Sequence, residues 1–373
     1  MAGDVGASHG LWNYRNGKTM NNIRFVSLSS GSSGNCYYLG TDSYGILIDA
    51  GISARQIKKS LAANGIAFES IVALCITHDH ADHIKGAGYV GEKCGVPVYT
   101  TQTILNGMNR CYCMTQKIYS VGRPILKDVP FTIRDFTITA FEVPHDGTDN
   151  VGYRIEAGGR CFVFATDLGC IPDSVAGYLQ QAHCLILESN YDMEMLQQGP
   201  YPYYLKKRIV SRSGHLCNTD AADFLATHYH SGLEYVFLCH LSRENNTPEL
   251  AYKTIEERLS QSHIQVGRDV QLVPLRRNTA SEVYVFPVEN QYRVPNRCGC
   301  FDVSSEEKSR AVYFDRPAFY WYCLFYSQYD SQDIWNEPKS PYEDAEFTEI
   351  LFGFGASFPI GVDSPCCMYS HQK

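Results

Sequence analysis

The sequence has no long apolar run, no leader-like start and no excess of basic residues. No segment reaches the roughly 18 consecutive apolar residues of a membrane-spanning helix, so we expect no membrane association. The first residues do not join a basic segment to an apolar stretch and a cleavage site, so we expect no secretory signal. Lysine and arginine number 32 against 40 aspartates and glutamates, and this net charge of −8 argues against a broad basic surface for nucleic acid.

The 15 cysteines form no evident disulfide framework. Cys75, Cys161, Cys184 and Cys239 lie within apolar segments, where a thiol acts as a small hydrophobic group. Unpaired cysteines are typical of reducing compartments. We therefore expect a cytoplasmic protein.

Four metal-ligand side chains lie within six residues, directly after the apolar segment 71–77. Alternate side chains of an extended chain face the same way, so His78 and His80 can hold one ion. Asp82 and His83 then face a second ion, as the chain turns into a helix. Imidazole and carboxylate ligands suit zinc or manganese. The cluster predicts a site for two divalent metal ions.

Three further residues complete this set, and each follows a strand-like segment. A carboxylate can bind one ion through each oxygen, so Asp167 is the natural bridge between two ions about 3.5–4 Å apart. His145 would complete the first site and His240 the second.

These ordered motifs resemble those of the metallo-β-lactamase-fold hydrolases, and the resemblance includes Asp49 at the end of segment 45–49. Within that superfamily the chain resembles the YycJ/WalJ type, whose members resemble 5′-to-3′ exonucleases. The segments that carry this closer resemblance are 29–35, 214–218 and 239–251, and the similarity runs from about Met20 to Phe286. Cys217 stands where that branch has a serine.

The resemblance implies an α/β fold, the four-layer αββα sandwich, with the metals at one edge between two sheets. It also implies which residues bind each metal: His78, His80 and His145 the first, Asp82, His83 and His240 the second, and Asp167 both. Asp49 would orient a ligand histidine through its other ring nitrogen. His215 matches a histidine that contacts the phosphate or helps the leaving oxygen depart, so Asp82, Asp167 and His215 are the expected catalytic residues.

Two divalent ions lower the pKa of a bridging water toward neutrality, which supplies a hydroxide nucleophile for several kinds of substrate. His80 argues against the flavodiiron oxidoreductases of the superfamily, which carry an acidic residue there. The Gly- and Ser-rich turn 29–35 could cradle an anion with its N–H groups, or form only a tight hairpin. Asn245 and Asn246 offer amide donors at the rim, or belong to the start of a helix.

We therefore expect a phosphodiesterase, most specifically a 5′-to-3′ exonuclease, with DNA or RNA as its partner. The alternative is a small-molecule metallohydrolase for a thioester, lactone or cyclic phosphate. The complete ligand set speaks against a protein that keeps the fold without catalysis. The basic residues 206–208 and Arg212 are the best candidate for a nucleic-acid contact because they lead into His215.

The domain organisation that we expect is an N-terminal extension at 1–19, disordered, and a hydrolase domain at 20–286. Only 72 residues separate Asp167 from His240, which excludes the inserted domain of the ribonuclease J type. Residues 287–373 form a C-terminal extension with 18 aromatics and five cysteines. It either binds a partner or has no evolved fold, and we favour the second interpretation.

Residue patterns predict the secondary structure of the domain. We expect strands at 23–28, 36–39, 45–49, 71–77, 96–100, 136–143, 160–166, 183–188, 235–239, 270–275 and 282–286. We expect helices at 54–64, 173–182, 218–230 and 248–262, and a long polar connection after the strand at 96–100.

Overall fold

The computed structural model describes residues 22–288. The predicted extension at 1–19 lies outside the described residues, as does the predicted extension at 287–373 apart from its first two residues. No helix in the described part of the chain is both long and apolar enough to cross a membrane.

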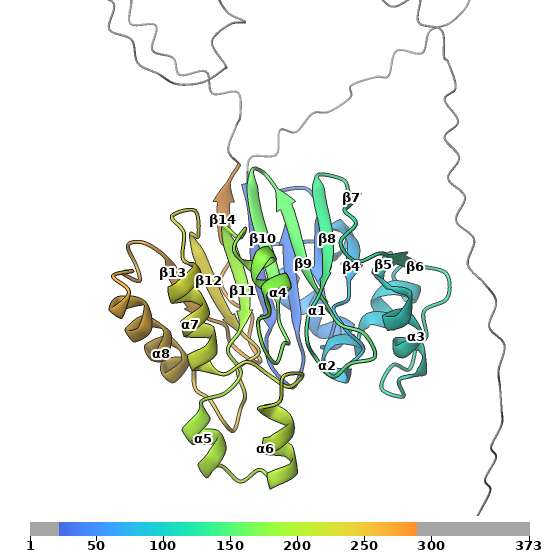
Figure 1. Ribbon diagram of the computed structural model, residues 1–373. Helices are drawn as coiled ribbons and strands as arrows, with labels where there is room; N and C mark the ends of the chain where they lie inside the picture. The colour runs from blue at the N-terminus through green and yellow to red at the C-terminus, as the bar shows by residue number, and fades with distance from the viewer. Residues whose placement is uncertain (1–21, 289–373) are drawn as a thin grey trace, which may run out of the picture. The chain divides into compact units, whose positions relative to one another are not determined.

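Two seven-stranded sheets form the centre of the fold (Figure 1). The first sheet has the order β14 (Tyr284–Pro287), β1 (Asn22–Ser29), β2 (Cys36–Gly40), β3 (Gly45–Ile48), β4 (Ile71–Cys75), β5 (Val98–Thr101) and β6 (Gly122–Ile125). The second has the order β13 (Gln271–Pro274), β12 (Tyr235–Cys239), β11 (Cys184–Glu188), β10 (Arg160–Ala165), β9 (Val151–Ala157), β8 (Phe136–Glu142) and β7 (Phe131–Ile133). Strands β3 to β6 are parallel, as are β10 to β13.

Successive side chains of each strand point to opposite faces of its sheet. Those on the inner faces fill the space between the two sheets. Phe164 of β10 and Phe237 of β12 face the first sheet, where the ring centroid of Phe25 lies 6.1 and 4.6 Å from theirs. The intervening residues Val163 and Val236 face the other way, into a second apolar cluster. Because successive strand residues point to opposite faces, these strands are apolar throughout and are buried on both sides.

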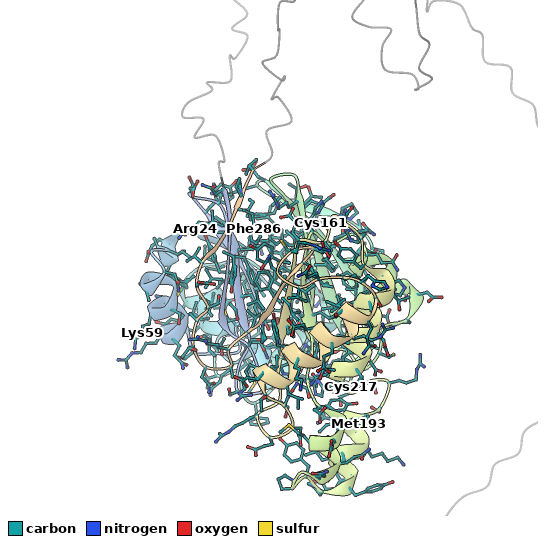
Figure 2. The ribbon with its side chains drawn as sticks, turned by 90° about the vertical axis from the view of Figure 1, so that its left-hand side faces the viewer. Arg24, Lys59, Cys161, Met193, Cys217 and Phe286 are labelled. Carbon is teal, nitrogen blue, oxygen red and sulfur yellow. The ribbon has the colours of Figure 1, made fainter. Side chains whose placement is uncertain are left out.

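Helices flank both sheets and also extend one end of the sandwich (Figure 1). They are α1 (Ala54–Ala63), α2 (Ala81–Ile84), α3 (Gln102–Arg110), α4 (Asp173–Leu179), α5 (Met193–Gln198), α6 (Tyr203–Ile209), α7 (Asn218–His228) and α8 (Pro248–Gln261). A short 3₁₀ helix at Phe68–Ser70 and a π-helical turn at Tyr89–Lys93 complete the helical segments of residues 22–288. The apolar faces of α4, α7 and α8 pack on the second sheet, and α1 packs on the first (Figure 2). The αββα sandwich predicted from the sequence is confirmed.

All four predicted helices are confirmed: each begins at the predicted residue and ends one to three residues earlier than predicted. α1 begins after Ser53, whose side chain and that of Gln56 form a capping box. The prediction of a long polar connection after residue 100 is wrong. This segment contains α3, which Thr101 caps, and then β6. Strand β9 was not predicted, and neither were α5 and α6. The sequence of α3 did not indicate a helix with a buried face, because it includes Asn106, Gly107 and Asn109.

The strand ends set the position of the polar residues. Asp49 follows β3, and the segment with His78 follows β4 in the same parallel pair. Asp167 follows β10, and Glu188 and His240 lie at the ends of β11 and β12. Because the carboxyl ends of parallel strands meet at one edge, these side chains gather at the same end of the sandwich.

Gly51 allows the loop after β3 to pack closely against the start of α2. A Cβ at Gly51 would lie 1.6 Å from the carbonyl oxygen of Asp82, at the start of α2. The Gly51 N–H donates to the Asn35 carbonyl at 2.8 Å, so the chain has no freedom to move away. A side chain at this position therefore forces α2 outward.

We predict that Gly51→Ala lowers the free energy of unfolding by about 1–3 kcal/mol, the usual cost of inserting an extra methyl into a packed region. The matched control is Gly177→Ala in α4, where an added Cβ meets nothing within 4 Å. That change raises the free energy of unfolding by about 0.5–1 kcal/mol, because alanine favours the helix. Urea unfolding of both variants measures these free energies. Equal changes in the two variants would contradict the prediction.

Candidate metal centre

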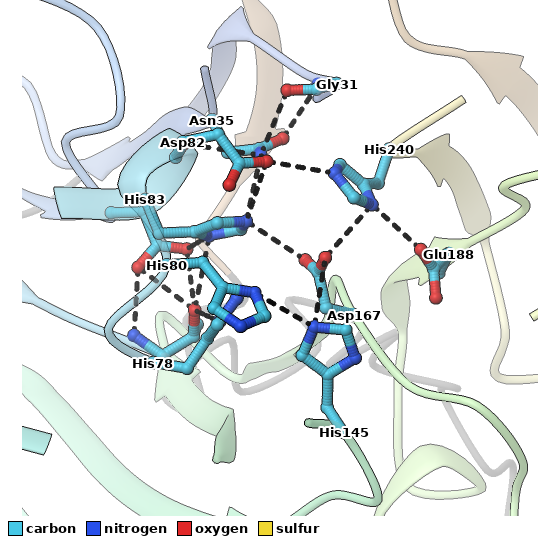
Figure 3. A network of polar contacts seen from close by, with 12 residues as sticks. Gly31, Asn35, His78, His80, Asp82, His83, His145, Asp167, Glu188 and His240 are labelled. Carbon is cyan, nitrogen blue, oxygen red and sulfur yellow. Dashed lines mark hydrogen bonds and ion pairs between the residues drawn. The ribbon is translucent and has the colours of Figure 1, made fainter. Parts of the chain in front are cut away.

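The seven predicted ligand side chains converge at one end of the sandwich (Figure 3). The loop after β4 and the short helix α2 provide His78, His80, Asp82 and His83. The loops after β8, β10 and β12 provide the rest: His145, Asp167 and His240. Residues that lie up to 162 positions apart in the sequence thus share one site.

Four overlapping groups of ligand-type side chains form within this site, and two of them match the sets predicted from the sequence. The ligand atoms of His78, His80 and His145 all lie within 4.8 Å of one another. The same is true of Asp82, His83 and His240. These are the two sets that the sequence predicts for two separate ions.

The Asp167 carboxylate lies between the two groups. Its Oδ2 is 3.2 Å from Nε2 of His83, and its Oδ1 is 3.0 Å from Nδ1 of His240 and 3.9 Å from Nε2 of His145. Burial raises the pKa of a carboxyl, but His240 and His83 outweigh that effect and hold the pKa of Asp167 well below its usual range. A buried, ionised carboxylate in this position faces both groups at once.

Unpartnered buried atoms indicate that a cation fits the site. Nε2 of His78 is buried and has no hydrogen-bond partner, and Oδ2 of Asp167 is buried with only the 3.2 Å approach of His83. Leaving such an atom unsatisfied costs about 1–3 kcal/mol, a cost that a coordinated ion removes. Burial, with His83 next in weight, holds the pKa of His78 well below its usual value, so its ring is neutral and can act as a ligand. The nitrogen and oxygen donors present are those that zinc and manganese prefer.

Asp49 lies behind His83, as its predicted role requires. Its Oδ2 accepts a hydrogen bond from Nδ1 of His83 at 2.7 Å, and its Oδ1 accepts one from the Thr77 N–H at 2.9 Å. The side chain is fully buried, and this burial raises the pKa of Asp49 although His83 and Thr77 oppose the rise. The contact turns Nε2 of His83 toward Asp167.

Glu188 is a site residue that the sequence analysis missed. Its Oε1 accepts hydrogen bonds from Nδ1 of both His215 and His240, each at 2.8 Å. Its Oε2 accepts the N–H groups of Leu168 and Leu216 at 2.9 and 3.1 Å. Burial raises the pKa of a carboxyl, but His215 and the other donors hold the pKa of Glu188 below its usual value. The available signal was an acidic residue at the end of an apolar strand.

His215 lies beside both groups and is more accessible than His240. Its ring centroid is 5.1 Å from that of His145 and 5.2 Å from that of His240. The His215 side chain is 18% exposed, against 3% for His240. Because Nδ1 donates to Glu188, Nε2 is the atom of His215 left for a substrate.

Asp146 is a second residue that the sequence analysis missed. Its Oδ1 lies 3.5 Å from Nε2 of His80 and 3.6 Å from Nε2 of His145, and its Oδ2 accepts a hydrogen bond from Nε of Arg208 at 2.5 Å. Burial raises the pKa of a carboxyl, but Arg208 and the histidines lower the pKa of Asp146 overall. Asp146 therefore connects α6 to the first group of ligands.

The Gly- and Ser-rich turn is built as a support for the site rather than as an anion cradle. The Gly31 N–H donates to Oδ1 of Asn35 at 2.8 Å, and the Gly34 N–H donates to the Gly31 carbonyl at 2.9 Å. The hydroxyl of Ser30 accepts the His240 N–H at 2.9 Å. Most donors of the turn are thus engaged within the protein, which favours the tight-turn interpretation.

The predicted rim position of Asn245 and Asn246 is also wrong. Both side chains are 1% exposed. Nδ2 of Asn246 donates to the Ser189 carbonyl at 2.9 Å, and α8 begins two residues later with Thr247 as its cap. These amides hold the loop that carries His240 and are not available to a substrate.

Comparisons with known proteins identify the family and the fold. Residues 44–240 match the family model described as "Beta-lactamase superfamily domain". The chain is 35% identical to "Exodeoxyribonuclease YycJ" of Bacillus anthracis over 66% of this chain and 92% of that protein. It is 34% identical to "Exodeoxyribonuclease WalJ" of Streptococcus pneumoniae over 69% of this chain and 96% of that protein. The metallo-β-lactamase-fold protein YhfI of Bacillus subtilis has a similar structure, with a TM-score of 0.54 and 18% identity over 71% of this chain and all of that one.

We predict that Glu188→Gln weakens Zn²⁺ binding by about 10–100-fold, because an amide does not fix the ring of His240 as a carboxylate does. Competition with a chromogenic chelator measures this affinity. The matched control is Glu257→Gln on the exposed side of α8, which leaves the affinity unchanged. Equal affinities in the two variants would show that Glu188 does not support a metal ligand.

Proposed function

We propose that this chain, which belongs to the beta-lactamase superfamily and to its YycJ/WalJ branch, is a 5′-to-3′ exonuclease that acts with two divalent ions. The chain is a metal-dependent hydrolase by its family. The observation that carries the finer proposal is the convergence of all seven ligand-type side chains in a chain that covers 92–96% of relatives named exodeoxyribonucleases. Those names favour DNA over RNA as the substrate.

Each residue of the site has a role in this proposal. His78, His80 and His145 would hold the first ion, Asp82, His83 and His240 would hold the second, and Asp167 would serve both. Bound zinc or manganese would supply a water that ionises near neutral pH and positive charge beside the attacked phosphate. Asp49 and Glu188 hold the rings of His83 and His240 through their Nδ1 atoms.

His215 would act on the leaving oxygen. Glu188 accepts from its Nδ1, so the protonated ring can present an Nε2–H to the substrate. A proton delivered from this atom would neutralise the 3′ oxygen as its bond to phosphorus breaks. Its greater exposure than the ligand histidine His240 supports contact with a substrate group.

A cytoplasmic location belongs to the same proposal. All ten cysteines within residues 22–288 are free thiols. The four that were expected from the sequence to be buried in strands are buried there: Cys75, Cys161, Cys184 and Cys239. A reducing compartment suits such a set.

We predict that the protein releases nucleotides from 5′-phosphorylated DNA in the presence of Mn²⁺ or Zn²⁺, and that Asp167→Ala or His83→Ala abolishes the release. Each change removes a group from the centre of the site. The control Asp173→Ala, an exposed position at the start of α4, retains the full rate. The assay includes 5′-hydroxyl ends, RNA, and thioester, lactone and cyclic phosphate panels. Turnover of a small-molecule panel without nucleotide release would overturn the proposal in favour of a small-molecule hydrolase.

A separate prediction concerns His215. His215→Ala lowers kcat on DNA by about 10²–10⁴-fold, the range for loss of a general acid, while the bound metal content is unchanged. The loss is much smaller on bis(p-nitrophenyl) phosphate, whose leaving group departs without a proton. Equal losses on both substrates would assign His215 a structural role instead.

A further inference from the structure

A hairpin of two short helices projects beside the candidate metal centre. Helices α5 and α6 lie at the end of the molecule where β10, β11 and β12 end (Figure 1), and Met193 marks the hairpin in Figure 2. Four of the ten exposed large hydrophobic side chains among residues 22–288 belong to it: Met193, Tyr203, Tyr204 and Val210. Tyr203 is 80% exposed and Tyr204 is 75% exposed. An exposed cluster of this kind marks a binding surface.

The hairpin is basic in an acidic chain. Residues 193–213 contain four basic side chains and one acidic side chain, whereas the whole chain has a net charge of −8. Nζ of Lys206 donates to the Gln197 carbonyl at 2.6 Å and ties α6 to α5. Lys207 and Arg212 are exposed and make no side-chain hydrogen bond or ion pair with the rest of the described chain. Their charges are available to an anionic ligand.

One face of α6 combines exposed hydrophobic side chains with basic side chains. Tyr203, Lys206, Lys207 and Val210 recur at the helical spacing of three and four residues, so they share a face. All four line a groove of about 480 Å³ between the two helices. The wall of the groove that α6 provides therefore carries both an aromatic ring and two basic side chains.

The hairpin is tied firmly to the metal centre. Nε of Arg208 donates to Asp146, which lies against His80 and His145. The His215 N–H donates to the Ile209 carbonyl at 2.9 Å, at the end of α6. Tyr204 lies one turn before Arg208, about 6 Å along the helix. A strand that leaves the metal centre along α6 would therefore pass both tyrosines.

We propose that the α5–α6 hairpin binds unpaired nucleotides of the DNA strand, with bases stacked on Tyr203 and Tyr204 and phosphates near Lys207 and Arg212. This inference rests on the proposed nuclease function. Exposed aromatic rings beside basic side chains are the usual combination for single strands, since every base has a face that can stack. Bases within an intact duplex have no free face, so the hairpin selects unpaired DNA.

The test compares the double variant Tyr203→Ala/Tyr204→Ala with Tyr112→Ala/Tyr119→Ala. The control tyrosines are 95% and 80% exposed and lie outside the hairpin. The probe is a fluorescein-labelled oligodeoxythymidylate with phosphorothioate linkages, and anisotropy gives its Kd for the full-length protein. We expect the hairpin variant to bind at least about fivefold more weakly for each ring lost, the lower limit for base stacking on an aromatic ring. The control variant binds as the parent does.

Two further measurements separate this inference from the proposed function. Hydrolysis of bis(p-nitrophenyl) phosphate reports on the metal centre alone, and the hairpin variant retains the parent rate. Lys207→Gln reduces the slope of log K against log salt by about 0.7, the value for one phosphate contact on a single strand, whereas Lys59→Gln on α1 (Figure 2) does not.

Equal oligonucleotide affinity in the two tyrosine variants would overturn the hairpin proposal, and so would an equal loss of affinity for a blunt duplex and the single strand. Those outcomes leave the proposed function standing if the parent degrades DNA. Conversely, a parent that hydrolyses no phosphodiester but binds the oligonucleotide through Tyr203 and Tyr204 would overturn the nuclease function while the hairpin remains a DNA-binding site.

Discussion

The interaction on which the site depends is the pairing of buried carboxylates with the imidazole rings around them. Removing an ion from water costs several kcal/mol in a protein interior, so a lone Asp167 would take up a proton. His240 and His83 keep it ionised, and Asp167 with its neighbours raises the pKa of His240 to about 10 despite the opposing effect of burial. Without a bound cation, protons supply the positive charge that the carboxylates require. Metal binding then exchanges one form of positive charge for another, with release of protons.

The arrangement of the sheets makes this concentration of charge possible. Parallel strands β10, β11 and β12 lie side by side, so Asp167, Glu188 and His240 follow one another across a single sheet edge. Asp49 and His240 both have positive φ angles, 59° and 52°. Such a conformation costs of order 1 kcal/mol or more in a residue with a side chain, and it persists where the surroundings fix it. Here the β3–β4 pair and the Ser30 hydroxyl fix the two backbones.

Local sequence was sufficient to find the ligand-type side chains that converge, and it was insufficient to find the residues that hold them. His78, His80, Asp82 and His83 are recognisable because four ligand-type side chains occur within six residues, and such a density is typical of a metal site. Glu188 and Asp146 act mainly through neighbours 27 to 66 positions away, so their roles require the register of the strands. The αββα layers followed from short apolar segments alternating with helical ones and from family resemblance. Helix α3 was missed because its polar residues outweigh a short buried face, and tertiary packing decides such segments.

The overall charge of the chain is a poor guide to what it binds. Acidic residues exceed basic ones by six within residues 287–373 and by only two within residues 1–286, so most of the negative charge belongs to the C-terminal segment of the sequence. Electrostatic interactions between exposed groups decay over about 8–10 Å at physiological salt. A phosphate at the α5–α6 hairpin therefore responds to Lys207 and Arg212 more than to the net charge. A metal centre of this type accepts several kinds of ester, so under the proposed function the charged and aromatic surface beside it would select a strand of DNA.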